Sequence, residues 1–156
     1  MKILMVCLGN ICRSPLAAGI LRKKIKAKGL SVTVNSAGTS DYHVGEPADP
    51  RTVETAMKYG VDIKSHKARQ FVAEDFDLYD KIFAMDRSNF NRILDLASET
   101  HDTTKVEMIM NVVEPGSNRD VPDPYFGLRD GFENVFTMLD EACEIIAGRI
   151  ENNKNL

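Results

Sequence analysis

KILMVCLGNICRSP, residues 2–15, joins an apolar segment to a helix start through a short polar loop. Residues 2–6 are β-prone and apolar on both faces, which is typical of a strand buried in a parallel sheet. Ser14 suits a helix N-cap and Pro15 the first helical position. The stretch therefore predicts a strand, a loop over residues 7–14 and a helix. Ligands of α/β proteins bind at such strand ends.

The rest of the chain alternates in the same way between short β-prone runs and amphipathic helical runs. Further strands are predicted over residues 31–37, 81–85 and 106–110. Helices are predicted over residues 14–29, 49–60, 86–97 and 131–150, with a helical turn over 73–79, loops over 38–48 and 114–129 and a frayed end over 151–156. This order predicts an α/β fold, a three-layer sandwich with a central four-stranded parallel sheet flanked by helices.

The composition is that of one globular domain spanning residues 1–156. The chain is 43% hydrophobic and 28% charged, and its formal net charge is -3. The acidic balance argues against general binding to nucleic acid, and no apolar run approaches the ~18 residues of a membrane span. The amino end lacks the features of a signal peptide. Cysteines at 7, 12 and 143 are too few for a disulfide framework, so we expect a cytoplasmic protein.

The loop after the first strand combines residue types that bind and attack a phosphate group. Gly9 leaves room for backbone N–H groups to curl around an anion, and Asn10 tolerates left-handed backbone angles. The helix start adds partial positive charge, and Arg13 can grip two phosphate oxygens. The same groups are expected to stabilise a Cys7 thiolate and lower its pKa, so that Cys7 attacks phosphorus. The Ser14 hydroxyl could donate to this sulfur as it leaves again.

A general acid for the leaving oxygen is expected in a segment near the carboxyl end. Asp123 stands between Pro122 and Pro124, which stiffen the backbone and would fix the direction of its carboxylate. Tyr125 and Phe126 follow, and we expect them to form an aromatic wall beside the phosphate. Each piece alone has a plainer interpretation as a core cysteine, a solvated arginine or an Asp-Pro turn. The combined pattern is hard to explain by packing.

Two anchors, residues 6–15 and residues 123–125, make the sequence resemble the low molecular weight protein tyrosine phosphatases. The resemblance spans essentially the whole chain, and the pairing of both anchors is specific. It implies hydrolysis of phosphotyrosine and small aryl phosphates through a phosphocysteine intermediate, without a cofactor or a metal. Cys7 matches the nucleophile, Arg13 the phosphate clamp, and Asp123 the general acid that then acts as the base in the second step.

The resemblance also assigns the residues around these three. It implies that the rest of the phosphate-binding loop consists of Leu8, Gly9, Asn10, Ile11, Cys12 and Ser14. It implies hydrogen-bond support of the loop by Ser36 and His66. The substrate rim would consist of Tyr42 and His43 on one side and Tyr125 and Phe126 on the other.

Three positions refine this expectation. Cys12 matches a second cysteine that can form a disulfide with Cys7 in this family, although a small buried residue is an equally good interpretation. Ile11 favours phosphotyrosine, because relatives that act on phosphoarginine tend to carry threonine there. Ala18 replaces an acidic residue that many relatives place near His66, so we expect His66 to be less basic than in those relatives.

The expected partners are phosphotyrosine-containing proteins or peptides, with phosphate and other oxyanions as inhibitors, and with neither nucleic acid binding nor membrane insertion. Three other functions stay open. A thioredoxin-coupled arsenate reductase has the same loop, but it needs further cysteines, and residues 83–96 contain none. A phosphocysteine carrier should hold the phosphoryl group rather than hydrolyse it, so the presence of Arg13 together with Asp123 counts against this function. A non-catalytic phosphate-binding module would not need Cys7.

Overall fold

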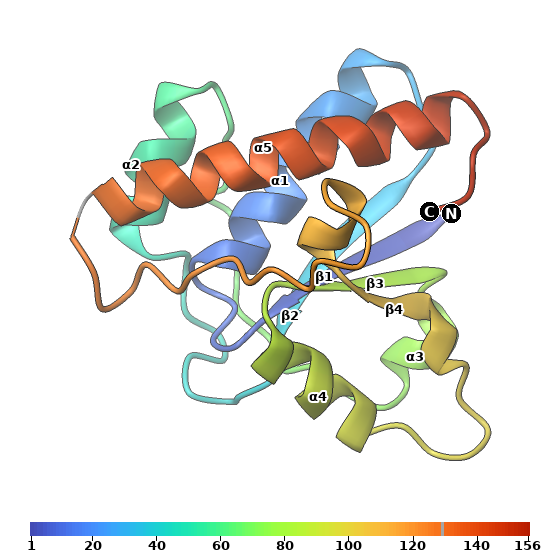
Figure 1. Cartoon of the computed structure of the whole chain (residues 1–156). Helices are drawn as coiled ribbons and strands as arrows, with labels where there is room; N and C mark the ends of the chain where they lie inside the picture. The colour runs from blue at the N-terminus through green and yellow to red at the C-terminus, as the bar shows by residue number, and fades with distance from the viewer. Residues whose placement is uncertain (129) are drawn as a thin grey trace.

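The computed structural model describes residues 1–128 and 130–156, and it confirms the predicted fold class. Within the described residues, one parallel sheet has the strand order β2-β1-β3-β4 (Figure 1). Its strands are β1 (Lys2–Cys7), β2 (Thr33–Gly38), β3 (Lys81–Ala84) and β4 (Val106–Met108). The helices are α1 (Arg13–Ala27), α2 (Pro50–Lys58), α3 (Asp75–Leu78), α4 (Arg87–Asp95) and α5 (Asp130–Glu151), with the 3₁₀ helices η1 (Thr103–Lys105) and η2 (Ile109–Val112).

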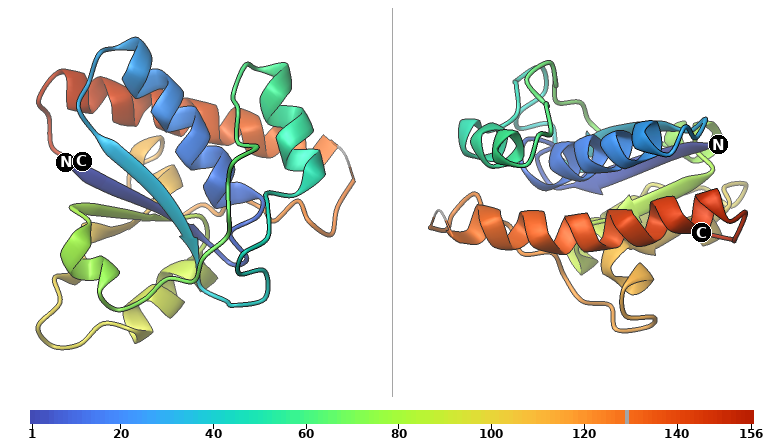
Figure 2. Two further views of the ribbon diagram at one scale, coloured as in Figure 1. Left: turned by 180° about the vertical axis from the view of Figure 1, so that it is seen from behind. Right: turned by 90° about the horizontal axis from the view of Figure 1, so that it is seen from above.

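The helices cover both faces of the sheet and make the three expected layers. α1, α2 and α5 lie on one face, and α3 and α4 lie on the other (Figure 1, Figure 2). In β1, Ile3 and Met5 pack into the core on the α1 side, whereas Leu4 and Val6 pack into the core on the α4 side. All four side chains are buried. Burial of both strand faces explains why this segment is apolar at every position instead of alternating.

The parallel register gathers the functional segments at one end of the sheet. Cys7 ends β1 beside Gly38, which ends β2, and Val6 pairs with Ala84 of β3. A Cβ on Gly38 would lie 2.7 Å from the Leu8 carbonyl oxygen, so only glycine lets β2 end so close to the loop. Both chain termini lie at the opposite end of the sheet (Figure 1, Figure 2).

Two predicted helix starts are confirmed, and one is wrong. Asp49 before α2 and Asp86 before α4 each accept a hydrogen bond from a backbone N–H of the first turn. The predicted N-cap at Ser14 is wrong, because α1 already begins at Arg13. The Ser14 hydroxyl lies 3.0 Å from the Cys7 sulfur instead, so tertiary contacts of the loop outweigh the local capping preference.

Several predicted ends are displaced by a few residues. β2 begins at Thr33, opposite Lys2 at the start of β1, rather than at residue 31. β4 ends at Met108 rather than at 110, because its partner strand β3 also ends there and the chain turns into η2. α4 ends at Asp95 rather than at 97, since the chain tightens into i→i+3 bonds. Glu151 is helical rather than frayed. Arg129, in the predicted loop 114–129, lies outside the described residues.

Candidate active site

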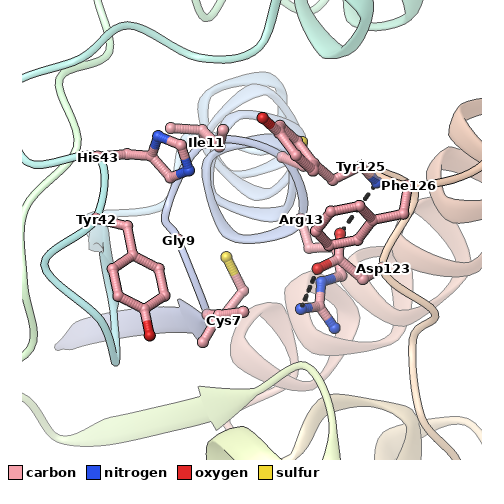
Figure 3. Close-up of a pocket in the computed structure, with 11 residues that line it drawn as sticks. Cys7, Gly9, Ile11, Arg13, Tyr42, His43, Asp123, Tyr125 and Phe126 are labelled. Atoms are coloured by element: carbon pink, nitrogen blue, oxygen red, sulfur yellow. Dashed lines mark hydrogen bonds and ion pairs between the residues drawn. The ribbon is translucent and has the colours of Figure 1, made fainter.

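A pocket of about 120 Å³ lies at the carboxyl end of β1. We call residues 7–14 the phosphate loop and residues 121–128 the acid loop. The Cys7 sulfur points into the space between Tyr42 and His43 on one side and the acid loop on the other (Figure 3). The lining comes from three segments and consists of Cys7, Leu8, Gly9, Ile11, Cys12, Arg13, Tyr42, His43, Asp123, Tyr125 and Phe126.

The Cys7 sulfur lies at the base of this pocket and is held by two polar groups. The Asn10 backbone N–H donates a hydrogen bond to Sγ over 3.3 Å. Ser14 Oγ lies 3.0 Å from Sγ, and either of these two atoms can donate. The cysteine is only 2% exposed, so few other donors reach it. Both neighbours can donate to a negatively charged sulfur, and they therefore stabilise negative charge on Cys7.

Asn10 holds the phosphate loop in shape from the inside. Its φ of 57° is left-handed, as its residue type predicts. Its side-chain Nδ2 donates to Ser14 Oγ (2.8 Å) and Ser36 Oγ (2.9 Å), and its Oδ1 accepts from the Arg69 backbone N–H (3.0 Å). Its backbone carbonyl accepts a hydrogen bond from His66 Nε2 (2.6 Å). The structure thus places both Ser36 and His66 against the loop.

His66 supports the loop as a neutral ring. Burial lowers the pKa of His66 from its ordinary value of 6.5, the bond to Asn10 partly opposes this, and Arg22 adds a further lowering. Ala18 is fully buried on α1 and has no carboxylate to offer the imidazole. A lower basicity of His66 than in relatives with an acidic residue at position 18 stays a prediction.

The phosphate loop presents free donors where α1 begins. Among the described residues, no acceptor pairs with the backbone N–H groups of Ile11, Cys12 and Arg13. Such groups at a helix N-terminus converge on one point and carry the positive end of the helix dipole. Donors in this arrangement can bind an anion above the Cys7 sulfur.

Arg13 is a buried cation surrounded by negative groups. Its Nη1 donates to Asp86 Oδ2 (2.6 Å) and to the Val121 carbonyl (2.9 Å), and its Nη2 lies 3.5 Å from Asp123 Oδ2. Burial works against its charge, but Cys7, Asp86 and Asp123 outweigh burial and raise the pKa of Arg13. Arg13 thus stays charged at the wall of the pocket and orders the residues around it.

Asp123 is the exposed member of this group. Its Oδ1 accepts a hydrogen bond from the Tyr125 backbone N–H over 3.1 Å, and the other oxygen faces Arg13 (Figure 3). The start of the acid loop is tied to the sheet, because Val121 N–H donates to the Met85 carbonyl (2.8 Å). The Asp123 carboxylate therefore lies beside the Arg13 guanidinium at the wall of the pocket.

The four predicted rim residues lie on two sides of the pocket. Tyr42 and Phe126 are 74% and 86% exposed, and the rings of His43 and Tyr125 approach to 6.0 Å between centroids. A Cβ on Gly9 would lie 3.0 Å from His43 Cδ2, so the missing side chain lets the imidazole lie over the loop. The rim leaves an aromatic slot above the phosphate loop.

The sequence did not predict the roles of two residues near the pocket, Asp86 and Arg51. Asp86 was predicted only as the start of a helix, yet it caps α4 and also pairs with Arg13. Its place just after β3, the neighbour of β1, was the available signal, because strand ends of a parallel sheet share one edge. Arg51 gave no such signal, since it stands in the first turn of α2.

Arg51 joins the phosphate loop to the acid loop. Its guanidinium pairs with Asp49 (2.9 Å), donates to the Tyr125 carbonyl (3.2 Å) and lies 4.8 Å from the centre of the Phe132 ring. The Asp49 backbone N–H donates to the Ile11 carbonyl (2.9 Å). One ion pair thus contacts both loops, and the acid loop is positioned from outside the pocket.

The two other cysteines are buried thiols. Burial raises the pKa of Cys12 to about 12, so at neutral pH it is protonated. Cys143 on α5 donates to the Ala17 carbonyl (3.5 Å), and burial raises its pKa as well.

The described residues contain no cluster of three His, Cys, Asp or Glu side chains that could hold a metal ion. No helix in the same part of the chain is both long and apolar enough to cross a membrane.

Known proteins match both the sequence and the fold. The family model for the low molecular weight phosphotyrosine protein phosphatases matches residues 2–156. A Synechocystis protein that carries this family name is 47% identical over 147 residues, or 92% of each chain. The protein tyrosine phosphatase of Entamoeba histolytica superposes with a TM-score of 0.90 at 37% identity over 98% of both chains. Drosophila arginine phosphatase superposes with a TM-score of 0.89 at 30% identity, covering 96% of this chain and 98% of that one. This chain therefore belongs to the low molecular weight phosphotyrosine protein phosphatase family, and it is a protein-tyrosine phosphatase, that is, a hydrolase.

Proposed function

We propose that Cys7, Arg13 and Asp123 together hydrolyse the phosphate ester of tyrosine in proteins or peptides. The observation that carries this proposal is their arrangement around one small pocket. The Cys7 sulfur forms its base, the Arg13 guanidinium its wall, and an Asp123 oxygen lies 3.5 Å from that guanidinium. Free backbone N–H groups of the phosphate loop complete an anion site above the sulfur.

In the first step, the Cys7 thiolate attacks phosphorus and forms a P–S bond. The bond between phosphorus and the tyrosine oxygen breaks, and the departing phenolate takes a proton from Asp123. Arg13 and the loop N–H groups bind the three equatorial oxygens, on which charge accumulates in the transition state. The products of this step are the free tyrosine side chain and phosphocysteine.

In the second step, water attacks the phosphorus of phosphocysteine. The Asp123 carboxylate takes a proton from this water, and the P–S bond breaks to release phosphate. The sulfur leaves as a thiolate, to which Ser14 Oγ can donate over the observed 3.0 Å. Both steps balance without a metal or a cofactor, and Asp123 returns to its protonated form.

The rim supports an aryl ester as the substrate. A flat phenyl ring fits between Tyr42 and His43 on one side and Tyr125 and Phe126 on the other. Ile11 lines the same pocket and offers an apolar contact to that ring. These contacts favour phosphotyrosine over phosphoarginine, although a similar fold serves an arginine phosphatase in Drosophila.

The partners in this proposal are phosphotyrosine-containing proteins or peptides in the cytoplasm, and not nucleic acid. Phosphate and other oxyanions would inhibit by occupying the loop. Cys12 lines the same pocket as Cys7, which supports a protective disulfide between them. Hydrogen peroxide would oxidise Cys7 to a sulfenic acid, and attack by Cys12 would release water. The raised pKa of Cys12 makes this second reaction slow.

Metal-free turnover of para-nitrophenyl phosphate, with and without Cys7→Ser, tests the proposal. We expect the substitution to lower turnover by at least about 10⁴-fold, because the nucleophile is lost. Cys12→Ser is the matched control, since it makes the same atomic change in the same loop and should keep most of the activity. Turnover by folded Cys7→Ser within a few-fold of the parent would refute the assignment.

The substrate is tested with paired peptides that differ only in phosphotyrosine or phosphoarginine. We expect a higher kcat/KM for phosphotyrosine. A preference for phosphoarginine would overturn the substrate while leaving the mechanism intact. Arsenate-dependent thiol consumption, or a stable phosphoenzyme without turnover, would instead support the reductase or the carrier.

A further inference from the structure

A second pocket, of about 460 Å³, lies beside the phosphate loop and shares no lining residue with the first. Two of its lining residues, Ser36 and His66, hydrogen-bond to Asn10, the residue that holds the loop in shape. Anything bound here would therefore contact the supports of the phosphate loop without entering the catalytic pocket.

Positive charge dominates the lining of this second pocket. Arg22 reaches it from α1, and Lys67 and Arg69 reach it from the segment after α2. Arg69 is neutralised by its ion pair with Asp75 (3.0 Å), whereas the described residues hold no ion-pair partner for Arg22 or Lys67. Asp62 is the one carboxylate of the lining. The lining of the pocket thus holds two cations without an ion-pair partner among the described residues, and one acidic side chain.

The Arg22 guanidinium is anchored but lacks a counter-charge. Its Nε donates to the Val34 carbonyl over 2.8 Å, which orients the planar group toward the pocket wall. Burial lowers the pKa of Arg22, and only Tyr79 opposes this. An arginine that is oriented, partly desolvated and unpaired binds oxyanions well, because its remaining N–H groups form a rigid fork.

We propose that this pocket binds a small dianionic oxyanion, of the class of phosphate and phosphate monoesters, between Arg22 and Lys67. His66 provides the third contact. Its Nε2 donates to the Asn10 carbonyl, so Nδ1 is the ring nitrogen left to face an anion. The volume leaves room for a small organic group on the phosphate. This site does not depend on the proposed catalytic mechanism.

Anion binding at this site would affect the phosphate loop through the hydrogen bond from His66 to Asn10. The charged or titratable groups that line the pocket with the imidazole are Arg22, Asp62, Lys67, Arg69 and Tyr79. An anion adds negative charge among them and favours the imidazolium, whose Nδ1–H would donate to the anion. The same proton gain strengthens the bond from Nε2 to the Asn10 carbonyl. The anion therefore stiffens the loop that holds Cys7.

The test is an NMR titration of the full reduced chain with orthophosphate at constant ionic strength. Saturating benzylphosphonate blocks the catalytic pocket first, and the backbone signals of Gly9 and Arg13 report its occupancy. We expect a saturable shift of the His66 ring and the Arg22 Nε signals. Failure of benzylphosphonate to bind would count against the proposed catalytic site and not against this one.

Three variants test whether orthophosphate binding depends on the cations of this pocket. Arg22→Gln should weaken orthophosphate binding by about tenfold or more, since it removes a charged donor. Lys67→Gln should weaken it by about threefold, and this side chain is exposed, so the substitution should leave the fold intact. Lys26→Gln is the matched control, because it removes an exposed charge from the same helix outside the pocket and should leave binding unchanged.

The same titration is repeated with glycerol 3-phosphate as an alternative ligand and with chloride as a control anion. Tighter binding of glycerol 3-phosphate identifies a phosphate monoester as the ligand, and tighter binding of orthophosphate identifies free phosphate. The proposal is overturned by the absence of a saturable shift, by equal shifts with chloride, or by unchanged binding in both Arg22→Gln and Lys67→Gln.

Discussion

The phosphate loop and the acid loop meet at one pocket but are built in opposite ways. From Asn10 to Ser14 every residue of the phosphate loop is buried, and the Asn10 side chain makes three hydrogen bonds. The acid loop is largely exposed, and beyond Val121 it is held by few hydrogen bonds to other segments. One side of the site is preformed, and the other is positioned by a few contacts.

This difference follows from the chemistry of the two loops. The nucleophile and the anion-binding N–H groups must have one fixed geometry, and burial with complete hydrogen bonding provides it. The acid must approach the leaving oxygen and then a water molecule, and the substrate must pass beside it. An exposed loop anchored at Val121 and at the Tyr125 carbonyl suits that task. The two regions should therefore respond differently to substitution.

Asp123→Ala, in the acid loop, should have the largest effect on catalysis. We expect kcat for phenyl phosphate to fall by ~10²–10⁴, the usual contribution of general acid–base catalysis. The loss should shrink for a leaving group that needs no proton, such as para-nitrophenolate. Steady-state kinetics across a series of aryl phosphates measures this. An equal loss for all leaving groups would make Asp123 a structural residue of the acid loop.

Asp86→Asn tests whether Arg13 is positioned by its partner at the end of β3. We expect kcat/KM to fall by about tenfold for every leaving group, because a charge-assisted hydrogen bond to Arg13 is lost. Asparagine is an equally good N-cap, so α4 and the melting temperature should change little. Unchanged or increased kcat/KM would show that Arg13 needs no such partner.

Arg51→Gln removes contacts that position the acid loop and leaves every residue of the phosphate loop unchanged. We expect a loss of about three- to tenfold in kcat, since one hydrogen bond and ring contacts to the loop disappear. The loss should grow with the pKa of the leaving group, as for Asp123→Ala. Arg92→Gln, an exposed arginine of α4, is the control. A uniform loss for all leaving groups would argue against a role through Asp123.

The smallest expected effect concerns His66, which supports the phosphate loop, and it is an effect of pH on the free energy of unfolding. Its pKa is lowered in the folded protein, so the unfolded chain binds more protons once pH drops below the ordinary value of 6.5. The free energy of unfolding should therefore decrease as pH falls from 6.5 toward the folded pKa and stay level above 6.5. Urea unfolding of the parent and His66→Gln at several pH values measures the difference. Identical pH profiles would exclude this linkage.

Local sequence signals predicted most of the fold. The apolar run over residues 2–6 and the helix starts at residues 49 and 86 depend on neighbours within a few positions. The failures occurred where tertiary contacts compete with such preferences. Ser14 is the clearest case, because its hydroxyl contacts Cys7, Asn10 and the Ala37 carbonyl instead of capping α1.

The sequence by itself determined the order of strands and helices, the phosphate loop and the candidate roles of Cys7, Arg13 and Asp123. These depend on residue types at short spacing, which a chain carries whether or not it is folded. Only the tertiary structure decided that Asp86 holds Arg13, that Arg51 joins the two loops, and that a second basic pocket lies beside Asn10. Such contacts join residues dozens of positions apart, and parallel strand order, not sequence spacing, brings them together.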